Sequence, residues 1–249
     1  MPPISKPDPW LPYRKPRPGA RVRLFCFPYA GGGASLYRTW QEDLPSSIEV
    51  CAVQLPGREG RLRDAPVAEM ARLVPMIADG LGAHLAQPFA LFGHSMGAAI
   101  SFELARELRR RGGPRPVHLF ASACPAPHLP DTDATHGLPE AEIIEQMRAL
   151  GGMSEELLQN REMMEMILPV FRADASVTET YAHATEAPLE VPLTAFGGLE
   201  DAKATRTEME AWRQHTSRAF ALAMMPGGHF AIQREARGAV LGVVGKTIG

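Results

Sequence analysis

The 249-residue sequence lacks several features that mark whole classes of protein. It has no apolar run of the ~18 residues that a membrane-spanning helix needs, and its first residues lack the apolar core of a signal peptide. The net charge is only −2 and no strongly basic block occurs, which argues against a nucleic-acid partner. We therefore expect a cytoplasmic protein that neither crosses a membrane nor binds nucleic acid.

Cysteine is also scarce. The three cysteines, Cys26, Cys51 and Cys124, are odd in number, widely spaced, and in or beside apolar runs. This pattern predicts buried thiols rather than a disulfide framework. The three cysteines also lack the spacing of a metal-ligand set, so we expect no metal site.

The chain does have ample hydrophobic content, 45%, in segments of two alternating kinds. Strand-like runs alternate with runs of helical periodicity, which predicts an α/β fold with a mainly parallel sheet flanked by helices. We expect strands at 21–27, 48–55, 89–92, 116–122, 191–196 and 220–225. The expected helices between them are 36–44, 68–85, 95–111, 207–215 and 234–247.

The strand rhythm stops between residues 125 and 188, where we expect helices at 140–150, 154–160 and 161–177. The chain is therefore expected to have a proline-rich N-terminal strap (1–20), a core (21–124 and 189–249) and a helical insertion (125–188). Trp10, Leu11 and Tyr13 are the strap residues expected to fix it to the core.

A serine between two glycines stands where the third strand passes into a helix. The segment Gly93-His94-Ser95-Met96-Gly97 has the G-x-S-x-G pattern of a nucleophile elbow, in which a tight strand-to-helix turn exposes the serine hydroxyl. The simpler interpretation is a helix N-cap serine beside turn glycines. The strand, turn and helix context favours the elbow.

A serine nucleophile needs a base, and the base needs an orienting group. In α/β-hydrolases these follow the serine in the order acid, then histidine. His229 follows the last expected strand on a glycine loop, where this fold delivers its base, and the other seven histidines lie elsewhere in the pattern. The acid is expected after the preceding strand, where Asp201 is the preferred candidate and Glu200 the alternative.

The oxyanion of an acyl-transfer reaction needs two backbone N–H donors. One is expected from Met96, directly after the serine. The other is expected from the glycine-rich loop after the first strand, with Ala30 preferred and Tyr29 next. A glycine run of this kind can also be a flexible turn without such a role.

Five segments together resemble one family. FCFPYAGGGAS, VQLPGREGR, FGHSMGA with SFELAREL, PLTAFGG followed by Asp201, and PGGHF are similar to the type II thioesterases, which are free-standing α/β-hydrolases of polyketide and nonribosomal peptide synthases. The resemblance covers about residues 10–240. One departure is Ala202, which stands where the family often has proline after the aspartate.

The resemblance implies an activity and its residues. A type II thioesterase hydrolyses acyl thioesters on the phosphopantetheine arm of acyl or peptidyl carrier protein domains. Ser95, Asp201 and His229 would form the triad, and Met96 and Ala30 would supply the oxyanion N–H groups. The reaction needs no cofactor, and nothing in the sequence suggests an obligate oligomer, so a monomer is expected.

The helical insertion resembles the lid of this family. Met147, Met163, Met164 and Ile167 are candidates to line an acyl channel under a mobile lid, because methionine fills irregular apolar gaps. The alternative is that they form the ordinary core of a small helical cap.

The PGREGR segment has no derivable chemical role. We expect Arg58 and Glu59 to form a structural ion pair, and Arg61 and Arg63 are candidates to contact an acidic carrier protein.

The sequence is also compatible with two other functions. A carboxylesterase or lipase would use the same triad on small oxygen esters. A non-hydrolytic protein that binds acyl carriers would have no need of the three triad residues together.

Overall fold

The computed structural model describes residues 8–129 and 134–249, and within them the chain forms one six-stranded sheet. All neighbouring strands are parallel, in the order β2-β1-β3-β4-β5-β6. The strands are β1 (Val22–Phe27), β2 (Ile48–Ala52), β3 (Phe89–His94), β4 (His118–Ser122), β5 (Leu193–Gly198) and β6 (Phe220–Met225). Each strand lies within two or three residues of its predicted range, so the predicted parallel sheet is confirmed.

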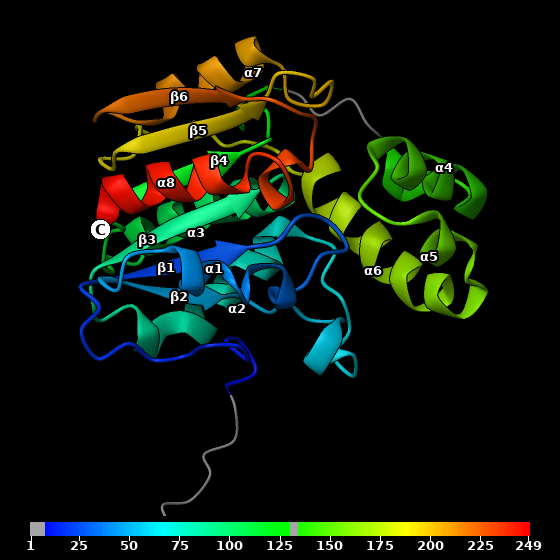
Figure 1. The fold of residues 1–249 in the computed structure, drawn as a ribbon, viewed down its shortest axis with the longest axis horizontal. Coiled ribbons are helices and arrows are strands. Elements are labelled where there is room, and N and C mark those ends of the chain that lie inside the picture. The colour runs from blue at the N-terminus through cyan, green and yellow to red at the C-terminus, as the bar shows by residue number, and fades with distance from the viewer. Residues whose placement is uncertain (1–7, 130–133) are drawn as a thin grey trace, which may run out of the picture.

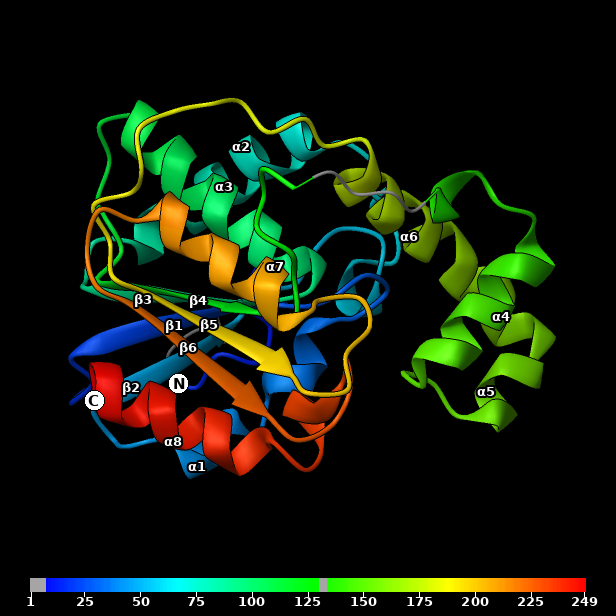
Figure 2. The same ribbon diagram turned by 90° about the horizontal axis from the view of Figure 1, so that it is seen from above.

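Helices cover both faces of this sheet (Figure 2). Helices α2 (Met70–Leu81), α3 (Met96–Arg110) and α7 (Arg206–Glu210) lie on one face, and α1 (Trp40–Asp43) and α8 (Arg237–Ile248) lie on the other. Short 3-10 helices occupy Ala34–Tyr37, Glu59–Arg61, Gly82–His84, Thr135–Gly137, Ala211–His215 and Ala231–Gln233. The predicted helices 36–44 and 207–215 are therefore each split between an α-helix and a 3-10 helix.

The alternation of strand residues explains the two-sided core. In β1, Phe25 and Phe27 pack with α2 and α3, whereas Leu24 and Cys26 pack toward α1 and α8. All four side chains are fully buried. Successive side chains of a strand point to opposite faces, so an uninterrupted apolar run such as Leu24–Phe27 is what a sheet covered on both sides requires.

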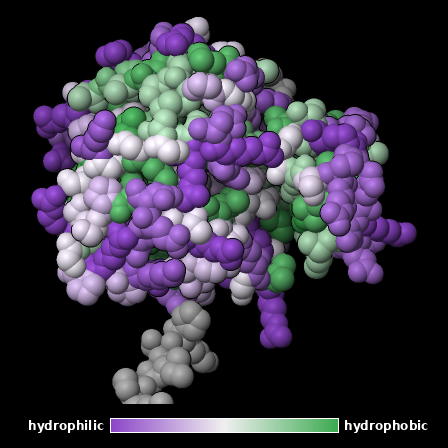
Figure 3. Space-filling model, in the orientation of Figure 1, coloured by the Kyte–Doolittle hydropathy of each residue, from purple (hydrophilic) through white to green (hydrophobic). Residues whose placement is uncertain are grey.

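The insertion between β4 and β5 is helical, as expected. It contains α4 (Glu140–Leu150), α5 (Glu155–Gln159) and α6 (Arg161–Glu179), which stand beside the ends toward which the strand arrows point (Figure 1). In the space-filling view, hydrophilic residues cover the outward side of the insertion, and hydrophobic patches gather where it meets the core (Figure 3). The division into strap, core and lid remains a prediction.

The described part of the N-terminal strap lies against the core. Leu11 is 2% exposed, and the guanidinium of Arg61 lies 4.2 Å from the ring centre of Trp10. The backbone carbonyl of Trp10 accepts the N–H of Gln54 just beyond β2. Trp10 and Leu11 therefore make the expected contacts, whereas Tyr13 is 37% exposed. Residues 1–7 lie outside the described part.

His118 in β4 gives the fold a pH dependence that can be measured. Burial lowers the pKa of His118 from 6.5 to about 4. The folded protein therefore binds this proton less readily than the unfolded chain, and the stability from His118 is complete above pH 6.5 and is lost as the pH falls toward 4. We expect wild type to lose about 2–3 kcal/mol more unfolding free energy than His118→Gln between pH 7 and 4.5.

Urea unfolding at the two pH values measures this difference. The Nε2 atom of His118 lies 2.9 Å from the hydroxyl oxygen of Thr194, and glutamine offers an amide at this place without a titrating group. Parallel loss of stability in wild type and variant would show that His118 does not contribute to the acid sensitivity.

Candidate active site

Ser95 lies at a strained corner between β3 and α3. Its backbone angles are φ 53° and ψ −122°, a region that residues other than glycine seldom adopt. The N–H of Ser95 donates to the carbonyl of Ser122 at 2.8 Å, which ties the corner to the end of β4. The Ser95 side chain makes no capping hydrogen bond to α3. The helix-cap interpretation is therefore wrong, and the backbone is that of an elbow.

The two flanking glycines allow this corner by close backbone approach. A Cβ on Gly93 would lie 2.0 Å from the carbonyl oxygen of Gly97, and a Cβ on Gly97 would lie 2.2 Å from that of Phe27. Real contacts of this kind essentially never fall below 3.0 Å. The elbow therefore packs directly against the end of β1, and both positions require glycine.

Replacing the second glycine tests this packing. We expect Gly97→Ala to lower the free energy of unfolding by about 3 kcal/mol, because the backbone of β1 cannot yield to the new methyl group. Gly242→Ala in α8 is the matched control, since a Cβ there meets nothing within 4 Å, and it should change stability by about 1 kcal/mol or less, in the stabilising direction. Urea unfolding followed by circular dichroism measures both, and equal stabilities would contradict the close approach.

His229 and Asp201 meet across the loops that follow β6 and β5. The Nδ1 atom of His229 lies 2.9 Å from Oδ2 of Asp201, and the two side chains are 10% and 1% exposed. The other carboxylate oxygen, Oδ1, accepts the backbone N–H of Lys203 at 2.9 Å. Because a carboxylate accepts the hydrogen from Nδ1, the Nε2 atom of His229 remains to serve as a base.

Glycines also bring these two loops together. A Cβ on Gly198 would lie 2.4 Å from the carbonyl oxygen of Gly227, and Gly227 itself has φ +98°. The N–H of Glu200 donates to the same Gly227 carbonyl, and its side chain is exposed. Of the two acids considered from the sequence, the structure therefore brings Asp201 and not Glu200 to the histidine.

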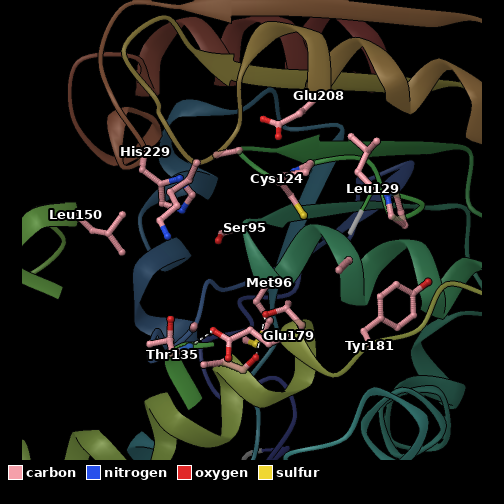
Figure 4. Close-up of a pocket in the computed structure, with 18 of the residues that line it drawn as sticks. Ser95, Met96, Cys124, Leu129, Thr135, Leu150, Glu179, Tyr181, Glu208 and His229 are labelled. Atoms are coloured by element: carbon pink, nitrogen blue, oxygen red, sulfur yellow. Dashed lines mark hydrogen bonds between the residues drawn. The ribbon is translucent and has the colours of Figure 1, made fainter. Parts of the chain in front are cut away.

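Ser95 and His229 line one cavity of about 320 Å³ between the core and the insertion (Figure 4). Ala30 and Met96 also line it. The N–H of Met96 belongs to the first turn of α3, whose N–H groups have no acceptor within the helix. Tyr29 instead packs on Phe230, with ring centres 4.8 Å apart.

Strand order explains why these groups converge. Phe27 is paired with Gly93, so the loop after β1 begins beside the Ser95 corner. The chain turns to β2 on one side of β1 and to β3 on the other, and ligands of open parallel sheets bind at such a reversal, beyond the carboxyl ends of the strands. Ala30 and Ser95 thus share the crevice that this fold class uses for ligands.

The insertion supplies part of the cavity wall, but from residues other than the predicted ones. Its lining residues include Gln146, Leu150, Phe171, Ala175, Thr178 and Glu179. Met147 and Met164 are buried in the insertion's own core, Ile167 packs against that core, and Met163 is 36% exposed. The structure does not place Met147, Met163, Met164 or Ile167 in the wall of the described cavity. The cavity is therefore not the expected acyl channel along these four residues. Three of them pack within the insertion, and Met163 lies at its surface.

The expected ion pair between Arg58 and Glu59 is wrong. Arg58 pairs with Asp174 of α6, with Nη2 2.8 Å from Oδ1. Glu59 accepts hydrogen bonds from the hydroxyl and the backbone N–H of Ser35. Arg61 pairs with Asp64, and its side chain is only 12% exposed.

His94 is a site neighbour that the sequence did not reveal. Its ring is fully buried, with its centre 5.3 Å from that of His229, and its Nδ1 lies 3.1 Å from Oγ of Ser122. Burial, and secondarily the nearby His229, lowers the pKa of His94 well below its ordinary value. A neutral ring therefore backs His229, which keeps a second positive charge away from the base.

Across 8–129 and 134–249, no three His, Cys, Asp or Glu side chains are placed to hold a metal ion. In the same residues, no helix combines the length and apolar character needed to cross a membrane.

A family model for the thioesterase domain matches residues 22–248. The chain belongs to the thioesterase family. The family explains why the elbow, the aspartate and the histidine occur in this order on a parallel sheet, and the predicted α/β-hydrolase fold is confirmed. As a thioesterase, the chain is a hydrolase.

Individual relatives refine this assignment. The chain is 47% identical to "Linear gramicidin dehydrogenase LgrE" of Brevibacillus parabrevis over 92% of this chain and 89% of that protein. RedJ, a thioesterase from the prodiginine pathway of Streptomyces coelicolor, superposes with a TM-score of 0.88 at 42% identity, covering 93% of this chain and 87% of RedJ. The type II thioesterase BorB from the borrelidin cluster gives 0.86 at 36% identity, covering 95% and 96%.

These similarities confirm the predicted resemblance to the type II thioesterases. The name of LgrE denotes a dehydrogenase, whereas the family model and both structures denote thioesterases. The arrangement of Ser95, His229 and Asp201 agrees with the latter.

Proposed function

We propose that this thioesterase removes aberrant or stalled acyl groups from the phosphopantetheine arms of acyl or peptidyl carrier protein domains in polyketide or nonribosomal peptide biosynthesis. One observation carries the proposal: Ser95, at a strained elbow, shares a cavity with a histidine that is bonded to a buried aspartate. The relatives LgrE, RedJ and BorB, named for gramicidin, prodiginine and borrelidin, support the biosynthetic setting.

Acylation of Ser95 is the first half of the proposed reaction. Nε2 of His229 takes the hydroxyl proton as Oγ attacks the thioester carbonyl, and Asp201 stabilises the imidazolium that forms. The N–H groups of Met96 and Ala30 stabilise the tetrahedral oxyanion. The carbon–sulfur bond then breaks, the pantetheine thiolate leaves and takes the proton from His229, and an acyl-Ser95 ester remains.

Deacylation is the second half. His229 takes a proton from water, which attacks the acyl ester through a second tetrahedral intermediate. The ester bond to Ser95 breaks, Oγ recovers the proton, and the free acid leaves. Every step uses side chains, backbone N–H groups and water, so the proposal includes no metal and no bound cofactor.

The partner and the cellular setting belong to the same proposal. The substrate arrives on a carrier protein, so the pantetheine arm has to reach the cavity between core and insertion. We propose that the insertion acts as a lid over this cavity, since Phe171 and Ala175 of α6 form part of the wall that Ser95 also lines. We also propose that the thioesterase meets the carrier protein in the cytoplasm and as a monomer.

Intact-protein mass spectrometry of loaded carrier proteins tests the proposal. Acetyl- and hexanoyl-carrier protein are incubated with the enzyme, and we expect both to return to the mass of the free-thiol form. Simple oxygen esters are assayed in parallel. Rapid cleavage of oxygen esters with untouched acyl carrier protein would instead identify a small-molecule carboxylesterase.

A further inference from the structure

A buried ion pair connects the insertion to the core outside the proposed triad. Arg58 follows β2 and Asp174 lies in α6, and their side chains are 7% and 1% exposed. Nη1 and Nη2 of Arg58 each bond one carboxylate oxygen, at 2.5 and 2.8 Å. Two parallel bonds of this kind fix direction as well as distance. Since burying two charges is costly even when they pair, the pair calls for a role beyond stability.

The same two side chains also hold the glycine loop. The backbone N–H of Gly31 donates to Oδ2 of Asp174 at 2.7 Å, and Nη1 of Arg58 donates to the carbonyl of Gly32 at 3.2 Å. The N–H of Gly32 donates to the carbonyl of Tyr29 at 2.9 Å. These bonds hold four successive peptide units, from the one that joins Tyr29 to Ala30 to the one that follows Gly32.

This geometry decides where the N–H of Ala30 points. That N–H shares a peptide unit with the Tyr29 carbonyl, and the two point in opposite directions in a trans peptide. Gly31 adopts φ +78°, and the Phe171 ring of α6 would lie 3.3 Å from a Cβ placed there. Helix α6 therefore contacts the loop through both Asp174 and Phe171.

We propose that Arg58 and Asp174 are positioning residues. They couple the position of α6 against the core to the direction of the Ala30 N–H, which has to point at the oxyanion. When α6 lies against the core, the Arg58–Asp174 pair fixes the glycine loop, and the Ala30 N–H points at the oxyanion. When α6 moves away, the loop loses the Asp174 bonds and the donor is misplaced. The inference rests on the proposed function, because it concerns the oxyanion donor of that reaction.

The test compares Asp174→Asn and Arg58→Lys with a matched control, Glu186→Gln. Glu186 pairs with Arg106, Arg109 and Arg110 of α3, and the Arg106 side chain is only 2% exposed. The Glu186 side chain is 28% exposed, so the control removes one charge from a partly buried ion pair that joins the segment after α6 to the core. It does so without touching the Arg58–Asp174 pair.

Four quantities are measured for each protein: kcat and KM on hexanoyl-carrier protein, the affinity for a trifluoromethyl ketone, and the urea midpoint. The ketone adds to a serine hydroxyl and forms an oxyanion, so its affinity reports the donors directly. For the Asp174 and Arg58 variants we expect kcat to fall about 10²-fold, ketone affinity to fall in parallel, and KM to stay within about threefold. The control should keep kcat, KM and ketone affinity within about threefold of wild type.

Unchanged kcat and ketone affinity in folded Asp174→Asn, with only the urea midpoint lowered, would overturn the inference and leave a structural ion pair. Should that variant not fold, Arg58→Lys decides, because it keeps the charge but loses the two parallel bonds. Failure of wild type on loaded carrier protein would refute the proposed function alone, since ketone affinity would still compare the variants.

Discussion

Ser95→Ala is expected to lower kcat on acyl carrier protein by roughly 10⁵–10⁶-fold. The hydroxyl is the attacking group of the proposed reaction, and neither His229 nor the oxyanion donors can replace it. The elbow itself should persist, because alanine adds no atom to the crowded turn. The same intact-mass assay measures the loss, with the variant followed over days instead of minutes.

Ser101→Ala is the matched control for this change. Ser101 lies in the second turn of α3, is fully buried, and donates its hydroxyl hydrogen to the carbonyl of Gly97 at 2.7 Å. The Ser101→Ala substitution therefore removes a hydroxyl close to the elbow without removing the nucleophile. We expect activity within about threefold of wild type and a free energy of unfolding lower by about 1 kcal/mol. A Ser95→Ala variant as active as this control would refute the acyl-serine mechanism.

Comparing wild type with Ser95→Ala also distinguishes an enzyme from a binding protein. A non-hydrolytic carrier-binding protein would leave acyl carrier protein intact in wild type and variant alike. A thioesterase loses turnover in Ser95→Ala but keeps affinity for the loaded carrier, because the serine contributes little to ground-state binding. Pull-down of the variant with hexanoyl-carrier protein measures that remaining affinity.

Local patterns account for what the sequence predicted well. The strands of the sheet are short apolar runs bounded by glycine and proline, so β1, β3 and β5 could be recognised without their neighbours. Chain order within an α/β-hydrolase then pointed to Asp201 and His229, and the structure places their side chains 2.9 Å apart. Motif and order suffice here because each loop follows a strand whose place in the sheet is fixed.

Long-range pairing accounts for what could not be predicted. Arg58 and Asp174 are 116 residues apart, and Asp174 interrupts a helical pattern as any polar residue would. Met147 and Met164 mark an apolar face, but periodicity does not say whether that face meets a ligand or its own helices. The sequence shows which faces are apolar, whereas their partners depend on the assembled fold.

Asp201→Asn is the second large effect, and we expect kcat to fall by about 10⁴-fold. Asparagine can present its amide N–H to Nδ1 of His229, which would place the proton on Nε2 and remove the base. The carboxylate also stabilises the imidazolium of the transition state, and the neutral amide does not. Stopped-flow acylation with a chromogenic thioester measures the loss in the first half-reaction.

Glu200→Gln is the control that separates the two acids considered from the sequence. Its side chain is exposed while that of Asp201 is 1% exposed, so we expect Glu200→Gln to keep activity within about twofold. Reversed effects, with Glu200→Gln nearly inactive and Asp201→Asn active, would move the orienting role to the neighbouring residue and require the loop after β5 to rearrange on substrate binding. Since the N–H groups of Glu200 and Lys203 already hold this loop to Gly227 and Asp201, such a rearrangement would break both bonds, and the structure therefore favours Asp201.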